Sequence, residues 1–179
     1  MLNIEDSLIV IIDIQEKLVN AVGKYSPVDK VCKIAQAGKI LGIPTIITEQ
    51  YPKGLGETVQ PLKEALSEDY LYVEKKSFST LLTPEFVEKL ENTHRKQIVI
   101  MGIEAHICVY QTICDLIDRG YEVYFVKDGS ASRNKYEFKT GVDLIRQVGA
   151  KVTCCEIVLF EWLKTSAHED FKPVQALIK

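Results

Sequence analysis

The stretch Met101–Val109, which reads MGIEAHICV, constrains the fold more than any other part of the chain. An apolar run of strand length, residues 97–101, leads into it, and apolar residues at helical spacing follow it as far as Gly120. The pattern predicts a buried strand, a tight turn and a helix whose first turn carries Cys108. The positive end of a helix dipole favours a thiolate over a thiol, so Cys108 is a candidate nucleophile. The competing interpretation is a small buried core cysteine.

Further apolar runs of strand length alternate with helical patterns along the chain. Strands are expected at residues 7–13, 44–48, 71–75, 121–126 and 151–159, the last with an apolar extension to Trp162, and helices at 28–41, from 84 and from 135 to about 148. The alternation predicts a doubly wound α/β fold: a mostly parallel, six-stranded, Rossmann-like sheet with helices on both faces. A length of 179 residues, 46% of them hydrophobic, fits a single domain over residues 1–179.

Composition argues against several classes of partner. The formal net charge is −3 and no block of like charge occurs, which does not suggest a nucleic-acid or anionic-membrane surface. The first residues lack the pattern of a signal peptide and no apolar run reaches membrane-spanning length, so a cytoplasmic location is expected. The five cysteines form no C-x-x-C pair and the three histidines are scattered, so no metal or other cofactor is expected.

Chemically useful side chains follow three of the predicted strands. Asp13 ends the first strand, Lys75 ends the third, and Cys108 follows the fourth. Because functional residues of such sheets gather beyond the carboxyl ends of the strands, these three are expected to meet. An ammonium can stabilise a nearby thiolate, and a carboxylate can accept the thiol proton and return it to a leaving group.

The chain also resembles the isochorismatase-like cysteine hydrolases. Four segments carry the resemblance in the family's order: Asp13–Gln15, Lys75–Ser79, Gly102–Val109 and Asp128–Arg133. The resemblance implies a catalytic triad of Asp13, Lys75 and Cys108 and a thioester intermediate on the cysteine. It also implies a cis peptide between Ile103 and Glu104, which would turn the Glu104 N–H to join that of Cys108 in an oxyanion hole.

Two adjacent lysines leave one assignment to be made. The family's pattern is Lys-x-x-Phe/Tyr-Ser, which selects Lys75, three residues before Phe78, over Lys76. On a strand the two lysines point to opposite faces, so only one of them can serve. Lys75 is therefore the predicted catalytic lysine.

The substrate is a small molecule in this interpretation. Gln15, Tyr51, Phe78 and Ile103 are the predicted substrate-binding residues, and the Gly- and Pro-bearing segment 49–58 is a candidate binding loop. The segment lacks the histidines of the metal site of nicotinamidases, which disfavours a metal-dependent nicotinamidase. It looks closest to the isochorismatase-domain-containing subgroup; some of its members have carried a ribonuclease label that the acidic charge balance does not support. Family members commonly assemble, so a homo-oligomer is expected.

Two alternatives to a hydrolase stay open. The fold could serve as a non-catalytic binding or scaffold protein, although a scaffold has no need for Lys75 together with Cys108. A thiol peroxidase or redox sensor is the third possibility. It lacks an identified resolving partner, because Cys114 lies on the same predicted helix, about a turn and a half from Cys108.

Overall fold

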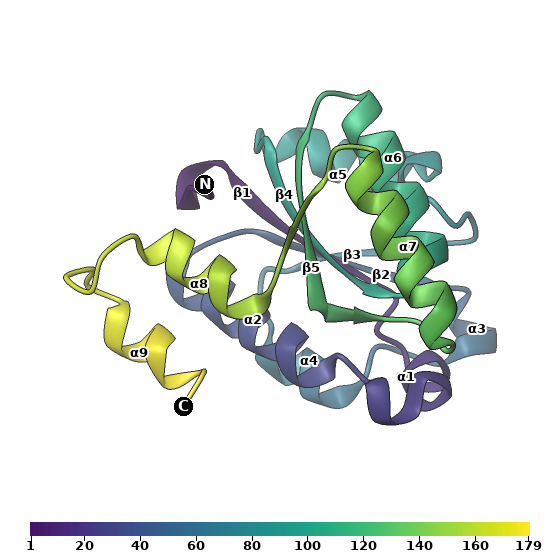
Figure 1. The fold of residues 1–179 in the computed structure, drawn as a ribbon, viewed down its shortest axis with the longest axis horizontal. Coiled ribbons are helices and arrows are strands. Elements are labelled where there is room, and N and C mark those ends of the chain that lie inside the picture. The colour runs from purple at the N-terminus through teal and green to yellow at the C-terminus, as the bar shows by residue number, and fades with distance from the viewer.

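A sheet of six parallel strands forms the centre of the protein, in a computed structural model that describes all 179 residues (Figure 1). The strand order is β3-β2-β1-β4-β5-β6. This confirms the predicted doubly wound fold, with a sheet that is parallel throughout. The strands are β1 Ser7–Ile12, β2 Thr45–Gln50, β3 Leu71–Lys75, β4 Gln97–Ile103, β5 Glu122–Ala131 and β6 Lys151–Thr153.

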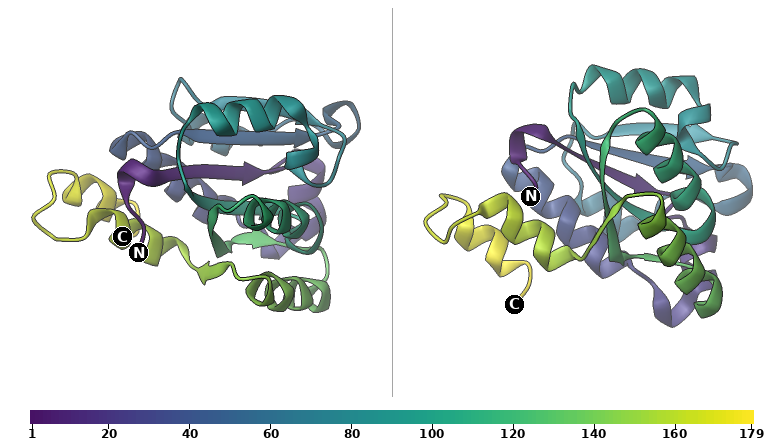
Figure 2. Two further views of the ribbon diagram at one scale, coloured as in Figure 1. Left: turned by 90° about the horizontal axis from the view of Figure 1, so that it is seen from above. Right: turned by 45° about the horizontal axis from the view of Figure 1, so that its top comes forward.

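Helices cover both faces of the sheet. Figures 1 and 2 show α5, α6 and α7 on one side and α2, α4 and α8 on the other. None of the helices is both long and apolar enough to span a bilayer. The helices are α1 Glu16–Val22, α2 Val28–Leu41, α3 Pro52–Leu55, α4 Gln60–Ala65, α5 Pro84–Asn92, α6 Tyr110–Asp118, α7 Lys135–Gln147, α8 Cys155–Leu163 and α9 Phe171–Ala176, with a π-helical turn at Ala105–Val109.

The alternation of side chains along β1 divides the core into two layers. Ile9 and Ile11 pack with the layer beneath α2 and α8, whereas Leu8, Val10 and Ile12 pack with the layer beneath α5, α6 and α7. Every residue of β1 is buried, as expected for a central parallel strand covered on both faces. The sheet is therefore a rigid base for whatever its strand ends carry.

The predicted strand at residues 151–159 is wrong beyond Thr153. The chain turns into α8 at Cys155, whose backbone N–H is capped by the carboxylate of Asp128 at 2.8 Å. Apolar residues lie all around this helix, and Trp162 is buried with its indole N–H donating to Ser7 Oγ at 2.9 Å. A helix that is apolar on most sides shows no amphipathic period, which is why the segment was predicted to be a strand.

The order of the strands reverses between β1 and β4, which are neighbours in the sheet. In this class of sheet the crevice for ligands opens beyond the carboxyl ends of the two strands at that point. Ile12, the last residue of β1, lies level with Thr48 of β2 and Gly102 of β4. Asp13 and the 102–108 turn therefore leave the sheet side by side.

Candidate active site

A buried ion pair lies at the carboxyl end of the sheet. The Lys75 Nζ is 2.7 Å from Asp13 Oδ2, and both side chains have an exposed fraction of 0%. Thr48 donates its hydroxyl to Asp13 Oδ1 at 2.6 Å, so both carboxylate oxygens are bonded. Thr48 of β2 and Lys75 of β3 therefore hold the carboxylate from two sides.

Lys75, and not Lys76, is the lysine that reaches Asp13. Lys75 is buried at the end of β3, whereas Lys76 is exposed. The Lys75 ammonium also donates to Gln50 Oε1 at 2.7 Å and to the carbonyl of Ser77 at 3.2 Å. Three oxygen acceptors thus satisfy the three protons of a charged lysine.

The Cys108 thiol is almost completely buried beside this pair, with an exposed fraction of 8%. Burial and the negative charge of Asp13 raise the pKa of the thiol to about 12, opposed by the positive charge of Lys75 and by the Glu104 N–H, which donates to the sulfur. Lys75 favours the thiolate as predicted, but burial and Asp13 outweigh it. The pKa of the thiol is therefore raised, opposite in direction to the shift expected from the helix position alone.

The turn between β4 and the helical segment brings Cys108 back over the strand end. Gly102 has a φ of +143°, and a Cβ at this position would lie 2.1 Å from the carbonyl oxygen of Ile12, so only glycine fits against β1. The peptide bond between Ile103 and Glu104 is cis. Cys108 then sits in the π-helical turn that precedes α6.

The side chain of Glu104 belongs to a charged cluster with Arg133 and His106. One of its carboxylate oxygens bonds the guanidinium of Arg133, and the other lies 3.4 Å from His106 Nε2 and has no hydrogen-bond partner. The second ring nitrogen of His106 bonds the Ser132 hydroxyl at 2.9 Å. These contacts tie the turn to the segment after β5.

Helix α7 packs against the turn that carries Cys108. A Cβ on Gly141 would lie 2.8 Å from both the Cα and the Cβ of His106. Glu137 of the same helix places a carboxylate oxygen 3.7 Å from His106 Nε2. The backbone that carries Cys108 is therefore confined between β1 and α7.

The four predicted substrate-binding residues occupy different places. Gln15 is fully buried, and its amide bonds the backbone of Gln50 and Gly56 at distances of 2.6 to 3.1 Å, so it holds the loop after β2 instead of facing a ligand. The side chain of Ile103 is fully buried in the core and cannot contact a ligand. Tyr51 and Phe78 have exposed fractions of 51% and 54% and remain available to one.

Three polar contacts of the site were not predicted from the sequence. Thr48 and Gln50 follow one another on the same face of β2, and their bonds to Asp13 and Lys75 could have been expected from the rule on strand ends. Arg133 ends one of the four segments that carry the resemblance, but nothing in the sequence pointed to its contact with Glu104. No three His, Cys, Asp or Glu side chains are grouped in a way that could hold a metal ion.

Comparison with known proteins identifies the family. The isochorismatase domain model matches residues 7–157. The chain belongs to the isochorismatase family. It is 38% identical to isochorismatase domain-containing protein 2 of Xenopus laevis, in an alignment that covers 96% of this chain and 83% of that protein. The shared region includes all four segments from which the resemblance was drawn.

Two solved structures superpose closely on this chain. The MAR1 ribonuclease of Caenorhabditis elegans matches with a TM-score of 0.93 at 36% identity, covering 99% of this chain and 91% of that one. The YcaC protein of Escherichia coli, described as an octameric hydrolase of unknown specificity, matches with a TM-score of 0.92 at 24% identity, covering 99% and 88%. The second likeness extends to the fold alone.

Proposed function

We propose that this protein is a cysteine hydrolase that cleaves an amide or ester bond of a small molecule through a thioester on Cys108. The observation that carries the proposal is the convergence of a carboxylate, an ammonium and a thiol that lie far apart in the sequence. Asp13 and Lys75 form a fully buried pair, and both act on the pKa of the same sulfur. A core cysteine needs neither of them.

The reaction begins with the proton of the thiol. Asp13 accepts it as the Cys108 sulfur attacks the carbonyl carbon, and the carbonyl electron pair moves onto oxygen. We assign the stabilisation of that oxyanion to the Glu104 N–H, whose hydrogen bond lowers the pKa of the same sulfur, together with the Cys108 N–H. Asp13 then returns the proton to the leaving amine or alcohol as the C–N or C–O bond breaks.

Hydrolysis of the thioester uses the same groups in the same roles. Asp13 takes a proton from a water molecule, the hydroxide formed attacks the acyl carbon, and the sulfur leaves and regains the proton from Asp13. Lys75 keeps the carboxylate in place and offsets the negative charge that passes between carboxylate and sulfur. Neither step requires a group that this chain lacks.

Two other functions receive less support. A scaffold protein that retains the fold gains nothing from a buried Asp13–Lys75 pair, because such pairs contribute little net stability. The Caenorhabditis elegans relative is named a ribonuclease. In this chain the formal net charge is −3, which does not favour binding to an RNA backbone.

We also propose that the chain assembles with copies of itself. Several large apolar side chains are exposed to solvent, among them Tyr136, with an exposed fraction of 77%, and Leu82, with 70%. Burial of such side chains in an interface would remove apolar surface from water.

The hydrolase proposal is tested by trapping the acyl group. The protein is mixed with p-nitrophenyl acetate, quenched in acid and mapped by peptide mass spectrometry. We expect an acetyl thioester on Cys108 that hydroxylamine removes, and a rate of formation that falls by about 10²–10⁴-fold in Asp13→Asn, the loss typical of a general base. Cys114→Ser serves as the matched control and should keep the wild-type rate. The proposal fails if the acetyl group settles on another residue, or if Asp13→Asn acylates Cys108 as fast as wild type.

A further inference from the structure

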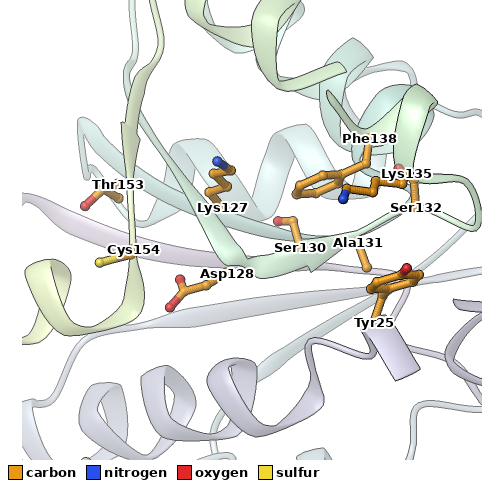
Figure 3. Close-up of a pocket in the computed structure, with 10 residues that line it drawn as sticks. All are labelled: Tyr25, Lys127, Asp128, Ser130, Ala131, Ser132, Lys135, Phe138, Thr153 and Cys154. Carbon is orange, nitrogen blue, oxygen red and sulfur yellow. The ribbon is translucent and has the colours of Figure 1, made fainter. Parts of the chain in front are cut away.

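A cavity of about 470 Å³ opens beyond the ends of β5 and β6, and the three residues assigned to the reaction take no part in its wall (Figure 3). Its size falls within the range of about 300–1,000 Å³ that is typical of small-molecule sites. The wall is formed by the end of β5, the start of α7, Thr153 and Cys154 at the end of β6, and Tyr25 after α1. The proposed chemistry at Cys108 leaves this cavity without a role.

The charges in the wall favour an anion. Lys127 and Lys135 both line the cavity, and neither forms an ion pair. The carboxylate of Asp128 also lines it but is occupied by the backbone N–H of Cys155, at 2.8 Å. Two cations and one anion leave the wall with a single excess positive charge, which matches a monoanion.

Aromatic side chains supply the rest of the recognition surface. The Phe138 ring lies above the β5 ribbon in Figure 3, on the same side as the ammonium groups of Lys127 and Lys135, and the Tyr25 ring lies below it. Tyr25 has an exposed fraction of 49%, so much of its ring surface is available. Aromatic rings gain stability by stacking on other rings, which favours a planar ligand.

The floor of the cavity is joined to the turn that carries Cys108. Ser130 is level with Gly102 in the sheet and accepts its N–H at 3.1 Å, and Ser132 bonds the ring of His106 at 2.9 Å. Both serines line the cavity. These hydrogen bonds keep the floor in a fixed shape, so the cavity does not have to form around its ligand.

We propose that this cavity binds a small aromatic monoanion, with its carboxylate between Lys127 and Lys135 and its ring against Phe138 and Tyr25. The site is separate from the thiol, so the proposal stands or falls independently of the hydrolase reaction. Benzoate is the simplest molecule of this class and is the probe used below.

Binding in the cavity can be followed through the reactivity of the Cys154 thiol, because this residue is partly exposed and lines the cavity. Labelling of the wild-type protein by iodoacetamide is followed at Cys154 and Cys114 by peptide mass spectrometry, with increasing benzoate. We expect benzoate to slow labelling of Cys154 severalfold and to leave Cys114, on α6, unchanged. Neutral benzamide should protect about tenfold less well, because it loses the charge-assisted hydrogen bonds.

Lysine variants then locate the anion. Lys127→Met and Lys135→Met should each raise the half-protecting benzoate concentration about tenfold. Lys139→Met, on the exposed side of α7 and outside the cavity wall, is the matched control and should behave as wild type. Thermal unfolding verifies that all three variants are folded.

Three results would overturn the proposal. They are equal protection by benzoate and benzamide, protection that survives in both cavity variants, and an absence of protection at any soluble benzoate concentration. Labelling that slows with rising protein concentration and ignores benzoate would show instead that a second copy of the chain covers the cavity. None of these outcomes bears on acylation of Cys108, which is measured separately.

Discussion

Removing either member of the Asp13–Lys75 pair should destabilise the protein strongly, and removing both should cost less than the sum of the two single losses. Both side chains are completely buried, and the two charges are 2.7 Å apart. Loss of one partner leaves an uncompensated charge in the core, which costs about 3–5 kcal/mol. For a chain of this length that corresponds to a fall in the melting temperature of roughly 6–20 °C.

The remaining contacts predict which single variant suffers more. In Asp13→Asn, Lys75 keeps two oxygen acceptors, Gln50 Oε1 at 2.7 Å and the Ser77 carbonyl at 3.2 Å. In Lys75→Met, the Asp13 carboxylate loses its one cationic partner and keeps neutral donors, among them the Thr48 hydroxyl at 2.6 Å. Lys75→Met should therefore lie at the upper end of the range and Asp13→Asn at the lower end.

Urea unfolding of the two single variants and the double variant completes the cycle. We expect the double variant to be more stable than the sum of the single losses predicts, with a coupling energy of about 2–3 kcal/mol. Lys76→Met, on the neighbouring exposed lysine, is the control and should stay within about 0.5 kcal/mol of wild type. Additive single losses, or a Lys76→Met variant as unstable as Lys75→Met, would refute the reasoning.

Two further predictions concern the nucleophile and its turn. Because the Cys108 pKa is raised to about 12, the thiol form persists at neutral pH, and iodoacetamide labelling at Cys108 should rise about tenfold per pH unit from neutral pH to about pH 10 without a plateau. Asp13→Asn removes a cause of the raised pKa, so iodoacetamide labelling of Cys108 at neutral pH should become faster while its acylation by p-nitrophenyl acetate becomes slower. If both rates rise or both fall, the assignment of Asp13 as the base is contradicted. Gly141→Ala should destabilise by about 1–3 kcal/mol and slow acylation, since the new methyl would lie 2.8 Å from His106, although alanine normally favours a helix. The exposed neighbour Thr140→Ala is its control in urea unfolding, and a Gly141→Ala protein as stable as wild type would rule out the close contact.

The side chains that meet at the ends of the strands could be predicted from the sequence, because their meeting depends only on the topology of the sheet. Asp13, Lys75 and Cys108 each follow a run of apolar residues, and a parallel sheet places all such ends at one edge whatever the details of packing. The rule places a strand end at this edge, but it does not say whether the side chain there faces the crevice or the core. Ile103 precedes the turn and was expected to contact substrate, yet its side chain belongs to the core.

Burial and ionisation could not be predicted in this way. The position of Cys108 in the first turn after β4 suggested a thiolate, but the pKa depends on the depth of the sulfur and on the approach of Asp13, which only the folded chain determines. The cluster of Glu104, His106 and Arg133 was hidden for the same reason. Pairwise contacts between distant polar residues leave no periodic pattern in a sequence.

The raised pKa of Cys108 is compatible with nucleophilic catalysis because of the charge balance around it. Before proton transfer the three groups are a carboxylate, an ammonium and a neutral thiol; afterwards they are a neutral acid, an ammonium and a thiolate. The net charge of the buried set is zero in both states, so the proton moves without adding charge to the core. Lys75 makes the set neutral, since without it the set would carry one negative charge in either state. In the proposed reaction the thiol stays protonated until a carbonyl group is in place, and Lys75 limits the cost of the transfer from Cys108 to Asp13.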